Sequence, residues 1–269
     1  MREAHERRTG QISPTFPGRR AALVIAHPGH ELRVHAWVEL ARPRTFVLTD
    51  GSGHTGQSRL ASTSRLLERT GAAPGGIYGR LTDRALYAAI LGGDVDLVAG
   101  LAGELAQALV DGEIDYVVGD ALEGYNPGHD LCRVIIDAAA ELAGRAGQRV
   151  ACLDFPLVGR PNECPPTLAA EAISLALDDA AFARKLAATH AYAELAGEVA
   201  ATFAETGLEA FRIECLRPVG DSAPPEDPPY YERYGERQVI AGHYERVLRY
   251  REHFAPLEAA LRHRIEATA

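Results

Sequence analysis

Two histidines on one short loop are the residues of this sequence best suited to chemistry. His27 and His30 lie in the segment Ala-His-Pro-Gly-His-Glu at 26–31, which follows an apolar run and precedes a helix-like pattern. A loop that joins a strand to a helix lies at the carboxyl end of a sheet, where open α/β folds bind their ligands. Neutral imidazole is a common zinc ligand, so the pair is suited to form half of a metal site.

A third histidine follows another predicted strand in the same way. His129 ends a polar loop over 120–129, after an apolar run over 116–119 and before a helix-like segment. Three protein ligands and one open position are typical of catalytic zinc, which lowers the pKa of its bound water to about 7. A single histidine near a helix start more often caps the helix or packs against it, so the spacing alone leaves both interpretations open.

These loops need a sheet that brings them to one edge, and the hydrophobic pattern predicts such a sheet. Short runs rich in Val, Ile and Leu alternate with longer segments of helical periodicity. This order is typical of an α/β, Rossmann-like fold with a parallel sheet and helices on both faces. The predicted strands cover 21–26, 44–49, 76–78, 116–119 and 149–154, and the predicted helices cover 31–41, 59–70, 95–110 and 130–143.

The pattern changes after residue 154. Prolines mark an irregular connection, an alanine-rich stretch over 178–206 has helical spacing, and 209–219 alternates like a final strand. A proline-rich acidic loop follows, and the rest of the sequence predicts one or two amphipathic helices. We therefore expect a flexible tail over 1–20, an α/β domain over 21–219, and a helical C-terminal extension over 220–269 that packs on this domain.

The composition argues against several classes of protein. The chain has 269 residues, enough for one large domain with an appendage, and its formal net charge of −9 argues against a general nucleic-acid binder. None of the four cysteines lies in a Cys-x-x-Cys pair, so no thiolate metal site is indicated. The sequence has neither an apolar run near the ~18 residues of a membrane span nor an apolar signal core at its start. We expect a cytoplasmic protein.

Five short matches occur in an order and spacing that point to one known family. They are Ala-His-Pro-Gly-His-Glu at 26–31, Thr-Asp-Gly at 49–51, Arg59 at a helix start, Leu-Thr-Asp at 81–83, and Asn-Pro-Gly-His at 126–129. In this combination the chain resembles the PIG-L/LmbE family of zinc-dependent de-N-acetylases, which remove acetyl groups from N-acetylglucosamine-type substrates. The family's motifs are Ala-His-Pro-Asp-Asp-Glu, Thr-Asp-Gly, Leu-Pro-Asp and His-Pro-Asp-His. The resemblance implies an LmbE-like fold.

The resemblance also implies a metal centre whose ligand set has changed. By position, His27, His30 and His129 would be ligands of Zn²⁺ or another divalent cation, with His30 in place of the family's aspartate. Gly29 stands where the family has its general base, and glycine can accept no proton. Asn126 replaces a histidine that assists the oxyanion, and its amide can still donate a hydrogen bond.

Three carboxylates are candidates for the missing functions. Asp50 ends the second predicted strand on the correct edge of the sheet, and Asp130 adjoins His129, so each is a candidate to move the proton. Glu31 is a candidate to orient a metal ligand without contacting the metal. Each carboxylate also has a purely structural alternative. At Asp130, for example, the helix dipole favours an acid in any case.

Three further residues are candidate substrate contacts. The family match suggests that Arg59 reaches the substrate and that Asp83 binds a sugar hydroxyl, although a solvated helix residue and a turn residue are the ordinary alternatives. Tyr125 lies beside the metal loop and could hydrogen-bond an intermediate or simply pack. The tyrosine-rich segment 230–235 suits saccharide rings, but a core or subunit contact is commoner for such a segment.

These residues together predict a metal-dependent hydrolase that removes an acetyl or other acyl group from an N-acetylated amino-sugar or related small amide, using metal-activated water. The alternative is a catalytically weak or inactive relative that binds a glycan or nucleotide-sugar, which the loss of the base at Gly29 favours. A dinucleotide-binding Rossmann protein is less consistent with the sequence, because no Gly-x-Gly-x-x-Gly follows the first strand. The expected partner is a small amino-sugar or glycoconjugate, and a homo-oligomer is left open.

Overall fold

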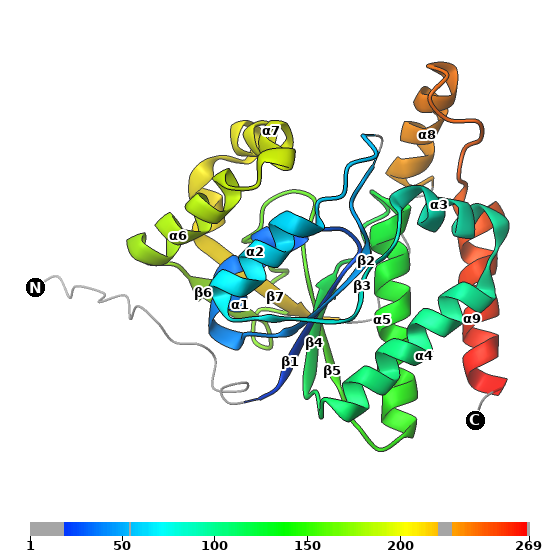
Figure 1. The fold of residues 1–269 in the computed structure, drawn as a ribbon, viewed down its shortest axis with the longest axis horizontal. Helices are drawn as coiled ribbons and strands as arrows, with labels where there is room; N and C mark the ends of the chain where they lie inside the picture. Colours follow the sequence, from blue (N-terminus) through cyan, green and yellow to red (C-terminus); the bar gives the residue numbers. More distant parts are fainter. Residues whose placement is uncertain (1–18, 54, 220–227, 268–269) are drawn as a thin grey trace, which may run out of the picture.

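A seven-stranded sheet forms the centre of the computed structural model, which describes residues 19–53, 55–219 and 228–267 (Figure 1). The strand order is β3-β2-β1-β4-β5-β7-β6. The first five strands pair in parallel, whereas β7 pairs antiparallel with both β5 and β6. The strands are β1 (Ala21–Ile25), β2 (Arg44–Thr49), β3 (Ala73–Leu81), β4 (Tyr116–Asp120), β5 (Ala151–Phe155), β6 (Ile173–Ala176) and β7 (Ile213–Pro218).

The strands that carry the candidate loops agree with the prediction. β1, β2, β4 and β5 begin and end within two residues of their predicted bounds, since their apolar runs are buried as parallel central strands require. β7 lies within the predicted strand over 209–219, but its antiparallel pairing makes the sheet mixed rather than wholly parallel. β6 was not predicted, because it has four residues and alternates buried with exposed positions, as a short edge strand does.

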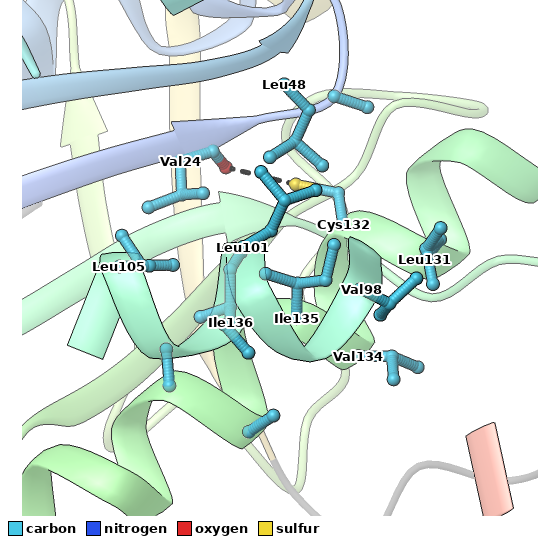
Figure 2. Close-up of a cluster of buried hydrophobic side chains, with 14 of the residues drawn as sticks. Val24, Leu48, Val98, Leu101, Leu105, Leu131, Cys132, Val134, Ile135 and Ile136 are labelled. Atoms are coloured by element: carbon cyan, nitrogen blue, oxygen red, sulfur yellow. Dashed lines mark hydrogen bonds between the residues drawn. The ribbon is translucent and has the colours of Figure 1, made fainter. Parts of the chain in front are cut away.

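One face of the sheet packs against helices that the chain forms between β3 and β5. These are α3 (Asp83–Gly92), α4 (Val95–Asp111) and α5 (Pro127–Arg145). Leu101 and Leu105 of α4 and Ile135 of α5 lie in one buried apolar cluster with Val24 of β1 (Figure 2). The predicted helix over 95–110 is confirmed, whereas α3 forms in a segment for which no helix was predicted.

The opposite face packs against a second set of helices. A 3₁₀ turn (His30–Val34) leads into α1 (His35–Ala41), and α2 (Leu60–Thr70) and α6 (Asp179–His190) complete the layer (Figure 1). The alanine-rich stretch predicted as helical is divided: α6 ends at His190, and α7 (Ala196–Thr206) begins after a short 3₁₀ turn (Ala193–Leu195). The division occurs where Tyr192 turns into the core and contacts Thr63 Oγ1 at 2.7 Å.

The C-terminal region is helical, as predicted. It contains α8 (Tyr230–Ile240), a π-helical turn (Tyr250–Phe254) and α9 (Ala255–Ala267), which packs against α4 and α5. The predicted tail lies outside the described residues up to residue 18, as does the loop over 220–227, so the division into three parts stays a prediction. Within the described part of the chain, no helix is long and apolar enough to cross a membrane.

A buried ion pair fixes the first helix against β7 of the sheet. Lys185 Nζ of α6 lies 2.8 Å from Glu214 Oε1 of β7, and both side chains are buried. Glu214 also accepts the backbone N–H groups of Ala36 and Trp37 at 2.9 Å each. These amides begin α1 and would otherwise lack partners, so the carboxylate caps the helix from another element.

Removing the cation from this pair should destabilise the protein strongly. We expect Lys185→Met to lower the free energy of unfolding by about 3–5 kcal/mol, because it leaves the Glu214 carboxylate buried without its counter-charge. Urea unfolding followed by circular dichroism measures this change. The control is Arg184→Met, which removes the pair of Arg184 with Glu39 on the surface and should change stability little. Equal, small effects of both variants would contradict the prediction.

Candidate functional site

Three imidazoles meet at the carboxyl edge of the sheet. His27 and His30 follow β1, and His129 lies in the first turn of α5 after β4. The ring centroids of His27 and His30 are 5.4 Å apart, those of His27 and His129 are 5.2 Å apart, and those of His30 and His129 are 4.5 Å apart. The structure therefore brings together the three residues that the sequence selected as metal ligands.

Local structure explains why the rings converge. β1 and β4 are neighbouring parallel strands, with Val24 opposite Gly119, so their loops emerge side by side. Asn126 caps α5 by accepting the N–H of Gly128 at 2.7 Å, and Pro127 occupies the first helical position. This cap sets the direction in which the first turn of α5 presents His129.

Each histidine of the first loop contacts a carboxylate through Nδ1. His27 Nδ1 lies 2.8 Å from Asp83 Oδ1 and 2.8 Å from Thr49 Oγ1, and His30 Nδ1 lies 2.9 Å from Asp120 Oδ1. A carboxylate that accepts from Nδ1–H leaves a lone pair on Nε2, which is how metal-binding histidines are held in most proteins. The Nε2 atom of His27 is buried and has no partner among the described residues.

The electrostatic environment keeps two of the imidazoles neutral. Burial lowers the pKa of His30 and of His129 well below the ordinary value, and the charges of neighbouring histidines and of Arg59 lower both further. Burial alone would raise the pKa of Asp83, but the hydrogen bond and charge of His27, with the hydrogen bond of Thr49, outweigh it, so the pKa is lowered. Neutral rings beside an ionised carboxylate are suited to bind a cation.

The donor set fits a divalent metal in its chemistry, and the distances between the ring centroids are close to those of a zinc site. Three imidazoles on one tetrahedral zinc ion, with Zn–N near ~2.0–2.1 Å, place their ring centroids roughly 5 Å apart, close to the distances between these rings. Within residues 19–53, 55–219 and 228–267, no group of three or more His, Cys, Asp or Glu side chains is arranged to hold a metal ion.

The two aspartates selected as candidate bases both support loops. Asp50 Oδ1 accepts the N–H and the hydroxyl of Ser52, at 3.0 and 2.6 Å, and so closes its own turn. Asp130 is buried, and its Oδ1 accepts the N–H groups of Glu123 and Gly124 at 3.1 and 3.2 Å. Burial raises the pKa of Asp130 to about 7. Its Oδ2 is buried and has no partner among the described residues, so this oxygen can still accept a proton.

Glu31 supports the loop backbone rather than an imidazole. Its Oε2 accepts the N–H of Gly29 at 2.7 Å, and burial raises its pKa. The carboxylates that contact the histidine rings are instead Asp83 and Asp120. Asp120 was not among the candidates drawn from the sequence, although an acid at the end of the strand that precedes His129 was a signal that could have identified it.

Position 29, where the resembled family has its general base, is covered by another part of the chain. Gly29 has a φ of +110°, which side-chain-bearing residues rarely adopt, and a Cβ atom there would overlap Leu195 Cδ1. Tyr192 lies on the same side, so the 3₁₀ turn (Ala193–Leu195) fills the space that a side chain would need. A side chain at position 29 would therefore fit only if Leu195 shifted.

The candidate substrate residues lie in different surroundings. Arg59 donates from Nε to the carbonyl of Gly51 at 2.7 Å, and its charge contributes to the low pKa of both His30 and His129, so it lies beside the imidazoles. Asp83 contacts His27 and Thr49, and its proposed sugar contact stays a prediction. Tyr125 stacks on Tyr230 of α8, with ring centroids 4.7 Å apart.

The fold is similar to that of a solved deacetylase, which confirms the predicted α/β architecture with helices on both faces of the sheet. The teicoplanin deacetylase Orf2, solved in a zinc-inhibited form, aligns with a TM-score of 0.51 and 14% identity over 76% of this chain and 100% of its own. The A40926 pseudoaglycone deacetylase Dbv21 aligns with a TM-score of 0.49 and 18% identity over 76% and 98%. The conserved protein TT1542 from Thermus thermophilus gives 0.49 and 17% over 76% and 96%.

At these identities the likeness concerns the fold alone. It rests on the alignment with Orf2, which has a TM-score of 0.51. No family model matches the chain, and no curated protein matches it either. What the site does is therefore argued from its own residues.

The covering of Gly29 can be tested by stability measurements. We expect Gly29→Ala to lower the free energy of unfolding by more than the roughly 1–2 kcal/mol that a left-handed backbone costs an alanine, because the new Cβ also meets Leu195. The control is Gly56→Ala, which has a φ of +71° but no atom within 4 Å of the new Cβ.

A double substitution separates the two contributions. Placing Gly29→Ala in a Leu195→Ala background should reduce its cost to that of Gly56→Ala, because only the backbone contribution remains. Thermal and urea unfolding of the four variants measure these costs. If Gly29→Ala cost the same with and without Leu195, the turn would not cover this position.

Proposed function

We propose that this chain is a metal-dependent amide hydrolase that removes an acetyl or other acyl group from an N-acetylated amino-sugar or related small amide. The observation that supports it most directly is the gathering of three imidazoles, two of them buried and the third half-buried, of which His27 and His30 contact carboxylates through Nδ1. Such contacts are typical of histidines that bind metal through Nε2. The deacetylase activity in the name of the fold neighbour Orf2 agrees with this proposal.

In this proposal His27, His30 and His129 hold Zn²⁺ or another divalent cation. When bound, the cation would polarise the amide carbonyl and activate water. The amide N–H₂ group of Asn126 would donate a hydrogen bond to the developing oxyanion, while its Oδ1 accepts from Gly128. Arg59 would bind a substrate oxygen beside the imidazoles, with Tyr125 as a further contact.

Because Gly29 can accept no proton, proton transfer is assigned to a carboxylate at another position. Asp50 and Asp130 are the candidates, and the unpartnered, buried Oδ2 of Asp130 is the observation that favours it over Asp50. Asp83 and Asp120 would act as positioning groups, because their oxygens contact His27 and His30. Glu31 would hold the turn that carries both histidines.

A second function follows from the covered position of Gly29. A protein of this fold that lacks the base could bind a glycan or nucleotide-sugar without hydrolysing it, and Leu195 leaves no space for a side chain at residue 29. Acetate release from N-acetylglucosamine, measured with and without added Zn²⁺, separates the two functions. Binding of the sugar without metal-dependent acetate release would favour the non-catalytic function.

Metal content tests the ligand set directly. We expect the purified protein to retain about one divalent ion per chain after dialysis, as a three-histidine site would, and His129→Ala to lose most of it. Elemental analysis by mass spectrometry gives the amounts. The control is His190→Ala, at the exposed end of α6, which should retain the metal. Equal metal content in both variants would overturn the assignment of the ligands.

A further inference from the structure

Four tyrosines form a row of rings in stacked and edge-to-face contact that begins at the loop of the candidate site. Tyr125 and Tyr230 stack with centroids 4.7 Å apart and planes 3° apart, Tyr230 and Tyr234 are 6.3 Å apart, and Tyr234 and Tyr244 are 6.4 Å apart. We call these four residues the tyrosine row. Their exposed fractions are 45, 37, 40 and 38%, so each ring keeps a large accessible surface.

The row begins at the loop that forms the candidate site. Tyr125 precedes Asn126, the residue that caps α5 and so positions His129. Tyr231 donates its N–H to the carbonyl of Gly124 at 3.4 Å, which attaches the start of α8 to this same loop. The row therefore extends the site outward along α8, which lies above the start of α5 at the carboxyl edge of the sheet (Figure 1).

The surface of the row is aromatic and hydroxylated. Burial raises the pKa of Tyr125 and of Tyr244, so both phenols stay neutral at physiological pH. Arg237 places its guanidinium 5.7 Å from the Tyr230 centroid and 5.9 Å from the Tyr234 centroid, and it donates to the Tyr230 hydroxyl at 3.3 Å. Exposed apolar surface of this kind commonly marks a binding site.

This combination suits a neutral saccharide. A pyranose ring has an apolar C–H face that packs on an aromatic ring, and a rim of hydroxyl groups that pair with phenol and guanidinium donors. The guanidinium of Arg237 beside two of the rings would repel a strongly cationic ligand, whereas the carboxylates of Glu198 and Glu205, whose charges act on Tyr125, would disfavour a strongly anionic one. The step from one ring to the next is comparable to the length of one pyranose unit.

We propose that the tyrosine row binds further sugar units of the substrate, so that the acylated sugar at the histidines is one unit of a neutral oligosaccharide. This inference rests on the proposed amide hydrolase function. It assigns the substrate class as an oligosaccharide rather than a free amino-sugar, and it gives α8 a role in binding the part of the substrate that does not react.

Substrate length provides the test. We compare kcat/KM for N-acetylglucosamine and for its β-1,4-linked trimer, both followed by acetate release. The wild-type protein should prefer the trimer, and Tyr234→Ala should lower the trimer-to-monomer ratio by about fivefold to tenfold, as the loss of one aromatic stacking contact would. Tyr234→Phe, which keeps the ring, should retain most of the preference. The control is Ile240→Ala, which removes an 88% exposed apolar side chain at the end of the same helix and should leave the ratio unchanged.

The outcomes separate this inference from the proposed function. If the monomer is hydrolysed but the ratio is the same in wild type and Tyr234→Ala, the row is not a sugar site. If neither sugar is hydrolysed, the proposed function fails, and calorimetric titration of the trimer still tests the row, because Tyr234→Ala should weaken binding while Ile240→Ala should not. A change of oligomeric state in Tyr234→Ala with unchanged trimer binding would identify a subunit interface and overturn the inference.

Discussion

The Asp120 carboxylate joins the two loops on which the candidate site depends. It ends β4, accepts the N–H of Ala26 at 2.8 Å through Oδ2, and contacts His30 Nδ1 at 2.9 Å through Oδ1. Burial raises its pKa to about 7, and the hydrogen bond from Ala26 opposes this rise. Because β1 and β4 are neighbouring parallel strands, one side chain at the end of β4 can hold both the backbone and the imidazole of the loop after β1.

The sequence was sufficient to predict the residues that meet but not the groups that hold them. Apolar runs and their order predicted β1 and β4 as strands of one sheet, and a strand–loop–helix pattern placed His30 and His129 at the same edge. The contacts of His27 with Asp83 and of His30 with Asp120 join residues 56 and 90 positions apart. No local periodicity encodes such contacts, because they depend on which loops the tertiary fold places side by side.

Gly29 shows the same limit of prediction from the sequence. Its identity alone predicted that this position lacks the general base of the resembled family. The sequence did not indicate that Leu195, from a turn far along the chain, fills the space beside it. The turn exists because Tyr192 enters the core between α6 and α7 and contacts Thr63, so the covering of residue 29 is built into the packing of the helical layer.

The charge around the imidazoles suggests why a histidine can stand at position 30. Asp83 has a lowered pKa and stays ionised, while burial keeps His30 and His129 neutral. A buried negative charge is stable only when a proton or a cation balances it. In the resembled family an aspartate would supply negative charge as a direct ligand. In the proposed site Asp120 would instead act through the ring of His30, which its carboxylate contacts, so the negative charge would lie one side chain farther from the cation and would still orient and polarise the imidazole.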